Sequence, residues 1–209
     1  MAQFFSVHPT HPQHRLIAQA AQIVRQGGVI GYPTDSSYAL GCHLADKESA
    51  DRLRRIRGVD EKHHLTLVCS DLAQVAVFAK VDTVRYRFLK QHAPGSFTFI
   101  LEATKEVPRR TLNPKRKTIG VRIPRHPVVQ ALLAELDEPL LSATAILRGE
   151  DEAVSDARIL REALEHELAL VLDAGACGIE PTTVIDLTGD QAVVLRQGAG
   201  RIERDMFLS

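Results

Sequence analysis

The residues best suited to chemistry in this sequence are polar side chains at the ends of short apolar runs. Thr34, Asp35, Ser36 and Ser37 follow the run 29–32. The same arrangement recurs at Ser142 and Thr144, at Thr182 and Thr183, and at Arg196. Loops just beyond strand ends are where open α/β sheets usually bind ligands. Candidate bases are few. The pattern therefore favours binding of a small anion, a carboxylate or phosphate, over acid–base chemistry, and phosphoryl or adenylyl transfer can work in this way.

Arg122 interrupts the apolar series Ile119, Val121 and Ile123. A guanidinium group near a sheet interior needs an anionic partner, because burial of an unpaired charge is costly. Two partners are equally open at this point. One is an internal aspartate or glutamate, and the other is a bound ligand.

Several common motifs are absent. The sequence contains no GxxxxGK[ST] loop, no GxGxxG after a strand, and no HExxH, GxSxG or EF-hand pattern. Cys42, Cys69 and Cys177 form no CxxC pair, so no local zinc or redox motif is predicted and free, largely buried thiols are expected. No metal-ligating set of side chains is predicted.

Charge is balanced overall but unevenly distributed. The chain has 26 Lys and Arg residues against 26 Asp and Glu residues. The segment 107–126 has no Asp or Glu, and all of its charged residues are cationic: Arg109, Arg110, Lys115, Arg116, Lys117, Arg122 and Arg125. A second basic group spans 52–62. Either block alone reads as a solvated face, but two blocks meeting in one cleft would focus a field on an anionic ligand.

The elements that must position these residues follow from apolar spacing. Helices are predicted near 16–24, 46–58, 71–79, 82–92, 127–136 and 156–167, and strands near 29–32, 65–69, 96–103, 118–123, 140–145, 169–173, 183–187 and 192–196. Because strands and helices alternate irregularly, a mixed sheet packed by helices fits better than a pure Rossmann fold.

Composition excludes several classes of protein. A chain of 209 residues with 44% hydrophobic and 25% charged residues fits one globular domain, 1–209, with no room for an additional C-terminal domain. No apolar run approaches the roughly 20 residues that span a bilayer, and the N-terminal residues do not read as a secretion signal. A membrane protein, a secreted disulfide scaffold, a coiled coil and a disordered chain are excluded, and a cytoplasmic location is expected.

The motifs, taken in order, resemble those of a known family. They are GVIGYPTDS (28–36), YALGC (38–42), RIR (55–57), PGSFT (94–98), TIGVRIP (118–124), SAT (142–144), PTTVID (181–186) and LRQG (195–198). Together they resemble the YrdC-domain family, most closely its YciO branch, over nearly the whole chain. The resemblance implies an α/β fold with a twisted, mostly parallel mixed sheet, flanked by helices around a basic cleft.

The resemblance also implies an activity. Well-studied members are threonylcarbamoyl-adenylate synthases, which combine L-threonine, bicarbonate and ATP into threonylcarbamoyl-AMP and release pyrophosphate. A separate transferase then passes the threonylcarbamoyl group to tRNA, and some members bind tRNA or double-stranded RNA. For this chain the resemblance implies ATP as a substrate, with Mg²⁺ bridging its phosphates without a dedicated protein cage, and no membrane partner.

Site residues follow position by position from the resemblance. The substrate-binding residues implied are Thr34, Cys69, Arg122, Ser142 and Thr182, with Arg122 pairing with the threonine carboxylate. The nucleotide-binding residues implied are Arg55, Arg57, Lys62, His64, Thr118, Thr144 and Arg196.

The chain departs from the family pattern at three positions. Arg55 replaces a lysine, Asp35 replaces a glutamate, and Ile146 stands where the family has an asparagine. An isoleucine side chain neither donates nor accepts a hydrogen bond, so weak synthase activity or altered substrate choice is expected.

Two alternatives remain open at the level of sequence. The first is a non-catalytic protein that binds double-stranded RNA or tRNA through the same basic cleft, which the cationic residues 109–125 and Ile146 motivate. With 5% aromatic residues and no tryptophan, such binding would depend on backbone and shape contacts. The second is a related adenylation of another carbamate or carboxylate.

Overall fold

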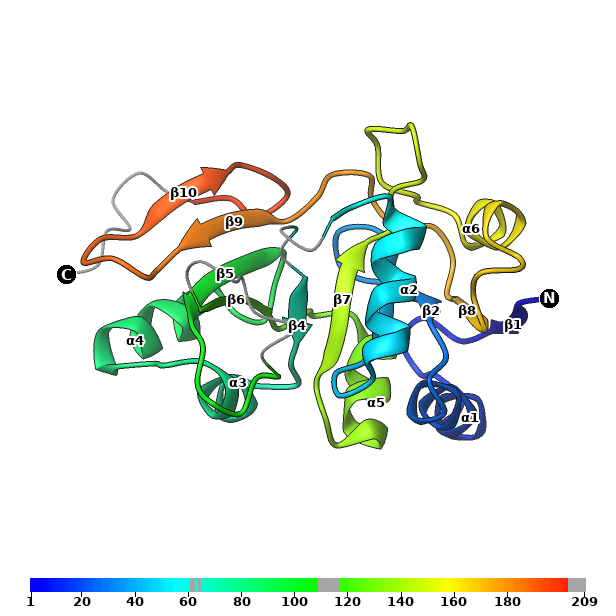
Figure 1. Ribbon diagram of the computed structural model, residues 1–209, viewed down its shortest axis with the longest axis horizontal. Coiled ribbons are helices and arrows are strands. Elements are labelled where there is room, and N and C mark those ends of the chain that lie inside the picture. Colours follow the sequence, from blue (N-terminus) through cyan, green and yellow to red (C-terminus); the bar gives the residue numbers. More distant parts are fainter. Residues whose placement is uncertain (61–62, 64, 109–116, 203–209) are drawn as a thin grey trace.

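The computed structural model describes residues 1–60, 63, 65–108 and 117–202. Within them the chain forms a ten-stranded mixed sheet flanked by six helices (Figure 1). The strands are β1 (Gln3–Ser6), β2 (Ile30–Tyr32), β3 (Ala39–His43), β4 (Thr66–Val68), β5 (Phe97–Glu102), β6 (Thr118–Arg122), β7 (Leu140–Thr144), β8 (Leu170–Asp173), β9 (Thr183–Asp186) and β10 (Val193–Arg196). The helices are α1 (His14–Arg25), α2 (Lys47–Arg57), α3 (Leu72–Phe78), α4 (Thr83–His92), α5 (Pro127–Leu136) and α6 (Ala157–Ala163).

The strand order across the sheet is β1-β8-β2-β3-β7-β4-β6-β5-β9-β10. The neighbouring pairs β1–β8, β2–β8, β4–β6 and β5–β9 are parallel, and the other five pairs between described strands are antiparallel. The predicted mixed α/β sheet is confirmed, but parallel pairs do not predominate as expected. Short connections such as 33–38 and 187–192 leave no room for the crossover that parallel neighbours require.

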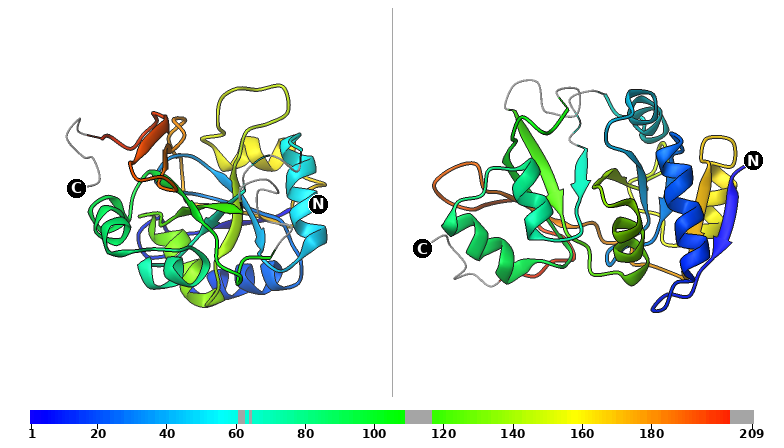
Figure 2. Two further views of the ribbon diagram at one scale, coloured as in Figure 1. Left: turned by 60° about the vertical axis from the view of Figure 1, so that its left-hand side comes forward. Right: turned by 90° about the horizontal axis from the view of Figure 1, so that it is seen from below.

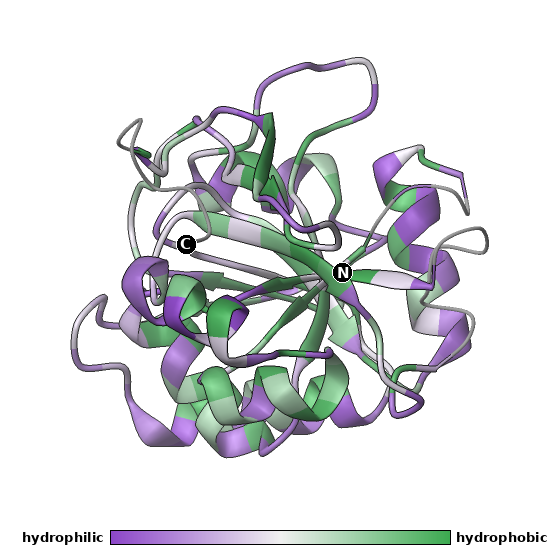
Figure 3. Cartoon of the chain, turned by 90° about the vertical axis from the view of Figure 1, so that its left-hand side faces the viewer, coloured by the Kyte–Doolittle hydropathy of each residue, from purple (hydrophilic) through white to green (hydrophobic). Residues whose placement is uncertain are grey.

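Each face of the sheet carries its own hydrophobic core. Because successive side chains of a strand point to opposite faces, Ala39 and Val68 pack on the α1 and α5 side, whereas Leu40 and Leu67 pack on the side of α2, α3, α4 and α6. Figure 2 shows α1 and α5 lying together beneath the sheet. The strands through the middle are largely hydrophobic and the helices are mixed in colour (Figure 3).

Helix α2 illustrates how local signals fix an element near the site. The Asp46 carboxylate accepts hydrogen bonds from the backbone N–H groups of Glu48 at 2.9 Å and Ser49 at 3.3 Å. The helix ends at Gly58, whose φ of 64° favours glycine. The predicted helix from Asp46 to Gly58 is confirmed, and its buried residues include the predicted Ala50, Leu53 and Ile56.

The other predicted helices and strands are present, with ends shifted by a few residues. Two strands were not predicted, namely β1 and β3. β3 is almost entirely buried, so it shows no alternation of apolar and polar residues, and β1 is only four residues long. No described helix combines the length and the apolar character that a bilayer crossing requires.

Candidate functional site

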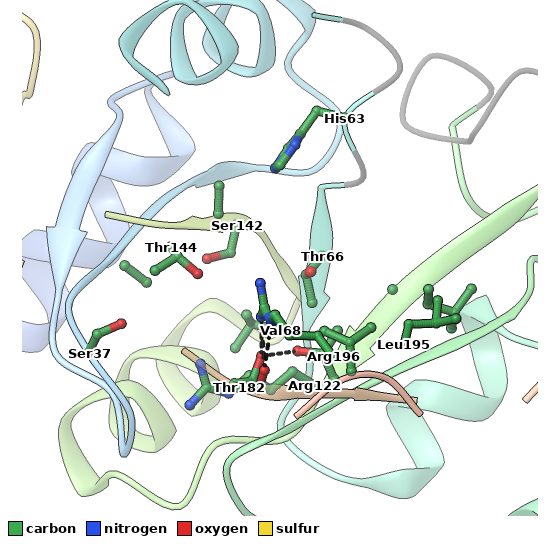
Figure 4. A pocket seen from close by; sticks show the side chains of 16 residues that line it. Ser37, His63, Thr66, Val68, Arg122, Ser142, Thr144, Thr182, Leu195 and Arg196 are labelled. Atoms are coloured by element: carbon green, nitrogen blue, oxygen red, sulfur yellow. Dashed lines mark hydrogen bonds between the residues drawn. The ribbon is translucent and has the colours of Figure 1, made fainter. Parts of the chain in front are cut away.

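A cavity of about 380 Å³ lies over the central strands, next to the core shared with α1 and α5 (Figure 4). It is lined by residues of β3, β4, β5, β6 and β7, of the β9–β10 hairpin, and of the segments that precede β3 and β4. The described lining residues are Ser37, Ala39, His63, Thr66, Val68, Thr98, Ile100, Gly120, Arg122, Ser142, Ala143, Thr144, Thr182, Val184, Leu195 and Arg196. This lining contains two guanidinium groups and six hydroxyl groups, and no carboxylate.

The floor of the cavity follows from strand alternation. Thr66 and Val68 on β4, Gly120 and Arg122 on β6, and Thr98 on β5 all point to the same face. A Cβ atom at position 120 would lie 3.2 Å from Thr66 Oγ1, so the glycine keeps the middle of the floor open.

Arg122 has an internal anionic partner and also faces the cavity. Its Nη2 donates to Asp35 Oδ1 at 2.6 Å and to Thr34 Oγ1 at 3.2 Å. The side chains are 9% (Arg122) and 17% (Asp35) exposed, and Arg122 Nε has no hydrogen-bond partner. Of the two partners left open by the sequence, the structure supplies the aspartate. The guanidinium group nevertheless remains part of the cavity wall.

Thr34 lies behind Arg122 rather than in the cavity wall. Its hydroxyl donates to the carbonyl oxygen of Ser37 at 2.6 Å and accepts from the backbone N–H groups of Ser36 and Ser37 at 3.2 and 3.3 Å. All of its hydrogen-bonding capacity is therefore used within the protein. Thr34 was expected to lie in the threonine pocket; it does not line this cavity, and its hydroxyl instead holds the turn and contacts Arg122.

Arg196 reaches the cavity from β10, the strand at one edge of the sheet. The pairing of β10 with β9 shifts register between Val194 and Arg196, and this irregularity lets Leu195 and Arg196 both line the cavity. Arg196 Nε and Nη2 donate to the carbonyl oxygen of Thr182 at 3.1 and 2.9 Å (Figure 4). Burial lowers the pKa of the guanidinium group, and no carboxylate of the described chain pairs with it.

Threonine hydroxyls complete this side of the cavity. Thr182 Oγ1 and Thr98 Oγ1 lie 2.8 Å apart. The neighbouring Thr183 points to the other face, where its hydroxyl donates to the carbonyl oxygen of Gly200 at 2.6 Å and accepts from the N–H of Gly198 at 2.8 Å. Each of the PTT and RQG motifs therefore has two roles. Thr182 and Arg196 line the cavity, while Thr183 and Gly198 join the two ends of the hairpin.

Five of the predicted site residues line the cavity. The lining residues are Arg122, Ser142, Thr144, Thr182 and Arg196. Lys62 and His64 lie outside the described residues.

The prediction that Cys69 lines the substrate site is wrong. Continuing β4, Cys69 shares the face of Leu67 and is buried in the opposite core, whereas Thr66 and Val68 face the cavity. Burial raises the pKa of the Cys69 thiol to about 12. Thr118 lies on the cavity face of β6 and is buried, but it does not line the cavity, and its hydroxyl has no hydrogen-bond partner.

Arg55 and Arg57 also lie outside the cavity wall. Arg55 is an exposed residue of α2. Arg57 is half-buried, and its Nη1 donates to the carbonyl oxygen of Ile146, two residues beyond the end of β7. Burial lowers the pKa of the Arg57 guanidinium group. Arg57 therefore joins α2 to the loop beyond the cavity instead of pointing into it.

Several lining residues were not predicted, namely Ser37 as a wall residue, Thr66, Thr98 and His63. Thr66 and Thr98 are polar residues in otherwise apolar runs, the same signal that singled out Arg122. Applied to the strands 65–69 and 96–103, it would have found both.

The side chains that line this cavity are suited to binding an anion. Two guanidinium groups and several hydroxyls can hold carboxylate or phosphate oxygens. In the described part of the chain, no group of three or more His, Cys, Asp or Glu side chains could hold a metal ion. The cavity thus suits a reaction in which substrates are positioned and developing negative charge is stabilised.

Comparison with known proteins gives consistent matches. A family model named for Sua5, YciO and YrdC, with the description "Telomere recombination", matches residues 22–198. The Escherichia coli (strain K12) protein YciO is 50% identical over 203 residues, which is 97% of this chain and 98% of that protein. The crystal structure of E. coli YciO superposes with a TM-score of 0.94 and covers the same shares of the two chains. The crystal structure of P. abyssi Sua5 complexed with L-threonine has a TM-score of 0.86 at 26% identity, over 93% of this chain and 57% of that one.

Proposed function

The chain belongs to the Sua5/YciO/YrdC family, and from this premise we propose that it binds ATP and L-threonine in the cavity and forms threonylcarbamoyl-AMP. The observation that carries the proposal is the cavity wall itself, in which Arg122 and Arg196 stand among hydroxyl groups without a lining carboxylate. A relative of the same fold, P. abyssi Sua5, has been solved in complex with L-threonine.

The amino acid would lie at the Arg122 end. A carboxylate can take a guanidinium N–H donor there, and Asp35 beside it offers an oxygen of opposite charge. Because Arg122 and Asp35 already pair with each other, the site is close to neutral. Such a site suits a zwitterion better than a polyanion.

The triphosphate would lie at the Arg196 end. Arg196 has no carboxylate partner in the described chain, so its charge is available to phosphate oxygens. Mg²⁺ would arrive with ATP, because the described lining offers hydroxyls but no carboxylate to hold the ion by itself. The ion would neutralise part of the phosphate charge.

The proposed reaction has two steps. The threonine amine adds to the carbon of bicarbonate, and water leaves to give a carbamate. A carbamate oxygen then forms a bond to the α-phosphorus of ATP, and the bond from that phosphorus to pyrophosphate breaks. The guanidinium groups stabilise the charge that develops on the phosphate oxygens. A separate transferase would then pass the threonylcarbamoyl group to tRNA.

The test is threonine-dependent release of pyrophosphate. Purified protein with ATP, Mg²⁺, bicarbonate and L-threonine should release pyrophosphate and yield a product with the mass of threonylcarbamoyl-AMP. Arg196→Met should lower this rate at least tenfold. Arg15→Met, which makes the same change at an exposed residue of α1, should leave it unchanged. If no product forms even at high protein concentration, the proposal fails.

RNA binding is the second proposal that the sequence raises. Most of the cations that motivate it, Arg109 to Arg116, lie outside the described residues. Double-stranded RNA should bind with an affinity that falls roughly 10³-fold or more over a few-fold increase in salt if about six phosphates are contacted. Absent or salt-insensitive binding would remove this function.

A further inference from the structure

Thr183, Gln197 and Gly200 are joined by hydrogen bonds at the open end of the β9–β10 hairpin, and we call them the hairpin triad. The Thr183 hydroxyl donates to the carbonyl oxygen of Gly200 at 2.6 Å. The Gln197 side-chain amide donates to the same carbonyl oxygen at 2.7 Å and to Thr183 Oγ1 at 3.3 Å. Thr183 Oγ1 also accepts from the N–H of Gly198 at 2.8 Å. Because a hydroxyl has one hydrogen and two lone pairs, the capacity of Thr183 is fully used.

The hairpin triad lies against the core on the face of the sheet opposite the cavity. Thr183 is fully buried. A Cβ atom at position 200 would lie 2.6 Å from the phenyl group of Phe97, so the Gly200 backbone touches the core directly. No member of the triad is among the described residues that line the cavity. Any effect of the triad on a ligand in the cavity must therefore pass through neighbouring residues.

Two residues of the cavity wall are the direct chain neighbours of the triad. Thr182 precedes Thr183, and Arg196 precedes Gln197. The Arg196 guanidinium group donates to the carbonyl oxygen of Thr182 (Figure 4). On its N-terminal side, Arg196 follows an irregularity in the pairing of β10 with β9, and the residues of β10 are exposed. The triad is thus the buried anchor next to Arg196, and it ties together the two chain segments that the guanidinium group bridges.

We propose that Gln197 and Thr183 are positioning residues for Arg196, which hold the open end of the hairpin so that the guanidinium group faces a polyanion in the cavity. The proposal rests on the proposed function in placing a triphosphate at the Arg196 end. It adds two residues outside the cavity on which the affinity for that triphosphate depends.

Calorimetric titration of the full-length protein with ATP and Mg²⁺, and with inorganic triphosphate as a second probe, tests this role. Gln197→Met keeps a long side chain at an exposed position and removes the amide donor. The affinity for both probes should fall about fivefold, the usual effect of losing one hydrogen bond. The affinity for L-threonine, which binds at the Arg122 end under the proposed function, should stay unchanged.

Gln130→Met is the matched control. The Gln130 side chain on α5 also donates to a backbone carbonyl oxygen, that of Pro124 at 2.6 Å, and it is not among the described residues of the cavity wall. This variant should bind ATP, triphosphate and L-threonine as the wild type does. Thermal unfolding of each variant checks that it is folded.

A double-mutant cycle separates positioning from a general loosening of the fold. If Gln197 acts through Arg196, Gln197→Met should change the ATP affinity less than about twofold in the Arg196→Met background. A general loosening would lower the affinity by the same factor in both backgrounds.

Two threonine variants test the other member of the pair. Thr183→Ser keeps the hydroxyl group and should bind ATP as the wild type does. Thr183→Val keeps the shape of the side chain without the hydroxyl and should match Gln197→Met in its loss of ATP affinity. If Thr183→Val does not fold, the Gln197 cycle still decides the proposal.

The outcomes are distinct. An unchanged ATP affinity in Gln197→Met, an equal loss in both backgrounds of the cycle, or a matching loss of L-threonine affinity overturns the inference. Failure of the wild type to bind either ATP or triphosphate overturns it as well. If the cycle shows that Gln197 acts through Arg196 while the wild type forms no threonylcarbamoyl-AMP, the inference stands and the proposed function fails.

Discussion

Replacement of Arg122 by methionine tests the ion pair at the base of the cavity. Met keeps the apolar stem and removes the charge. Among the described residues, the Ser96 hydroxyl, 3.3 Å from Oδ2, is then the one remaining side-chain donor to Asp35. Breaking a buried pair from one side typically costs 3–5 kcal/mol. Because Asp35 keeps this donor and 17% of its side-chain exposure, we expect a loss of about 3 kcal/mol in the free energy of unfolding.

A double-mutant cycle identifies the source of that loss. In the Arg122→Met background, Asp35→Asn removes the unpaired charge and should restore about 2 kcal/mol. Urea unfolding at neutral pH measures the four free energies, and a shift in midpoint at constant slope shows that stability alone has changed. The reasoning is refuted if Arg122→Met costs less than about 1 kcal/mol, the value typical of a surface pair, or if the double variant is no more stable than Arg122→Met. Threonine binding should be lost in both variants that lack Arg122.

Three further predictions concern packing, pH and thiol reactivity. Gly198→Ala should lower the free energy of unfolding by about 1–3 kcal/mol or more, because the new Cβ would lie 2.1 Å from the carbonyl oxygen of Pro181, while Gly189→Ala, whose Cβ meets nothing closer than 3.9 Å, serves as the neutral control in the same urea titration. Asp46→Ala should cost about 1 kcal/mol at neutral pH. Hydrogen bonds from the Ser49 hydroxyl and the helix N–H groups hold the pKa of the Asp46 carboxyl below its ordinary value. The stabilisation by the carboxylate is therefore present above about pH 4 and is lost as the pH falls through the lower folded-state pKa. Unfolding curves of wild type and variant recorded at successively lower pH should converge. In a thiol titration at neutral pH, Cys42 and Cys69, whose thiol pKa values burial raises to about 12, should react only after unfolding, and a native protein that exposes all three thiols at once would contradict this placement of the two side chains.

The sequence predicts elements whose signals are local. α2 is an example, because its cap at Asp46, its stop at Gly58 and its apolar face all lie within the segment. β3 escaped prediction because both of its faces are buried and its residues are mostly small. Gly41 within it lets the Tyr32 ring approach, since a Cβ there would lie 2.7 Å from the ring. That requirement comes from another strand and leaves no pattern in the segment itself.

The same division holds for the site. Arg122 could be singled out because its charge interrupts an apolar series. In the structure it pairs with the Asp35 carboxylate and also lines the cavity. The position of Arg57 could not be read, because its partner, the carbonyl oxygen of Ile146, lies 89 residues away in the chain. Cys69 shows the cost of transferring a role by alignment through a short strand, since a displacement of one residue moves a side chain to the other face.

The two arginines of the cavity lie on strands that differ in burial: β6 is buried and β10 is exposed. Arg122 belongs to β6, whose five residues are all buried between two neighbouring strands. Arg196 ends β10, an edge strand that pairs with β9 alone among the described strands, and all four of its residues are exposed. Protection of backbone amides against deuterium exchange should therefore be high in β6 and low in β10. Under the proposed function, local opening of β10 would release the end of the ligand that Arg196 holds, while the end that Arg122 holds would stay fixed by β6.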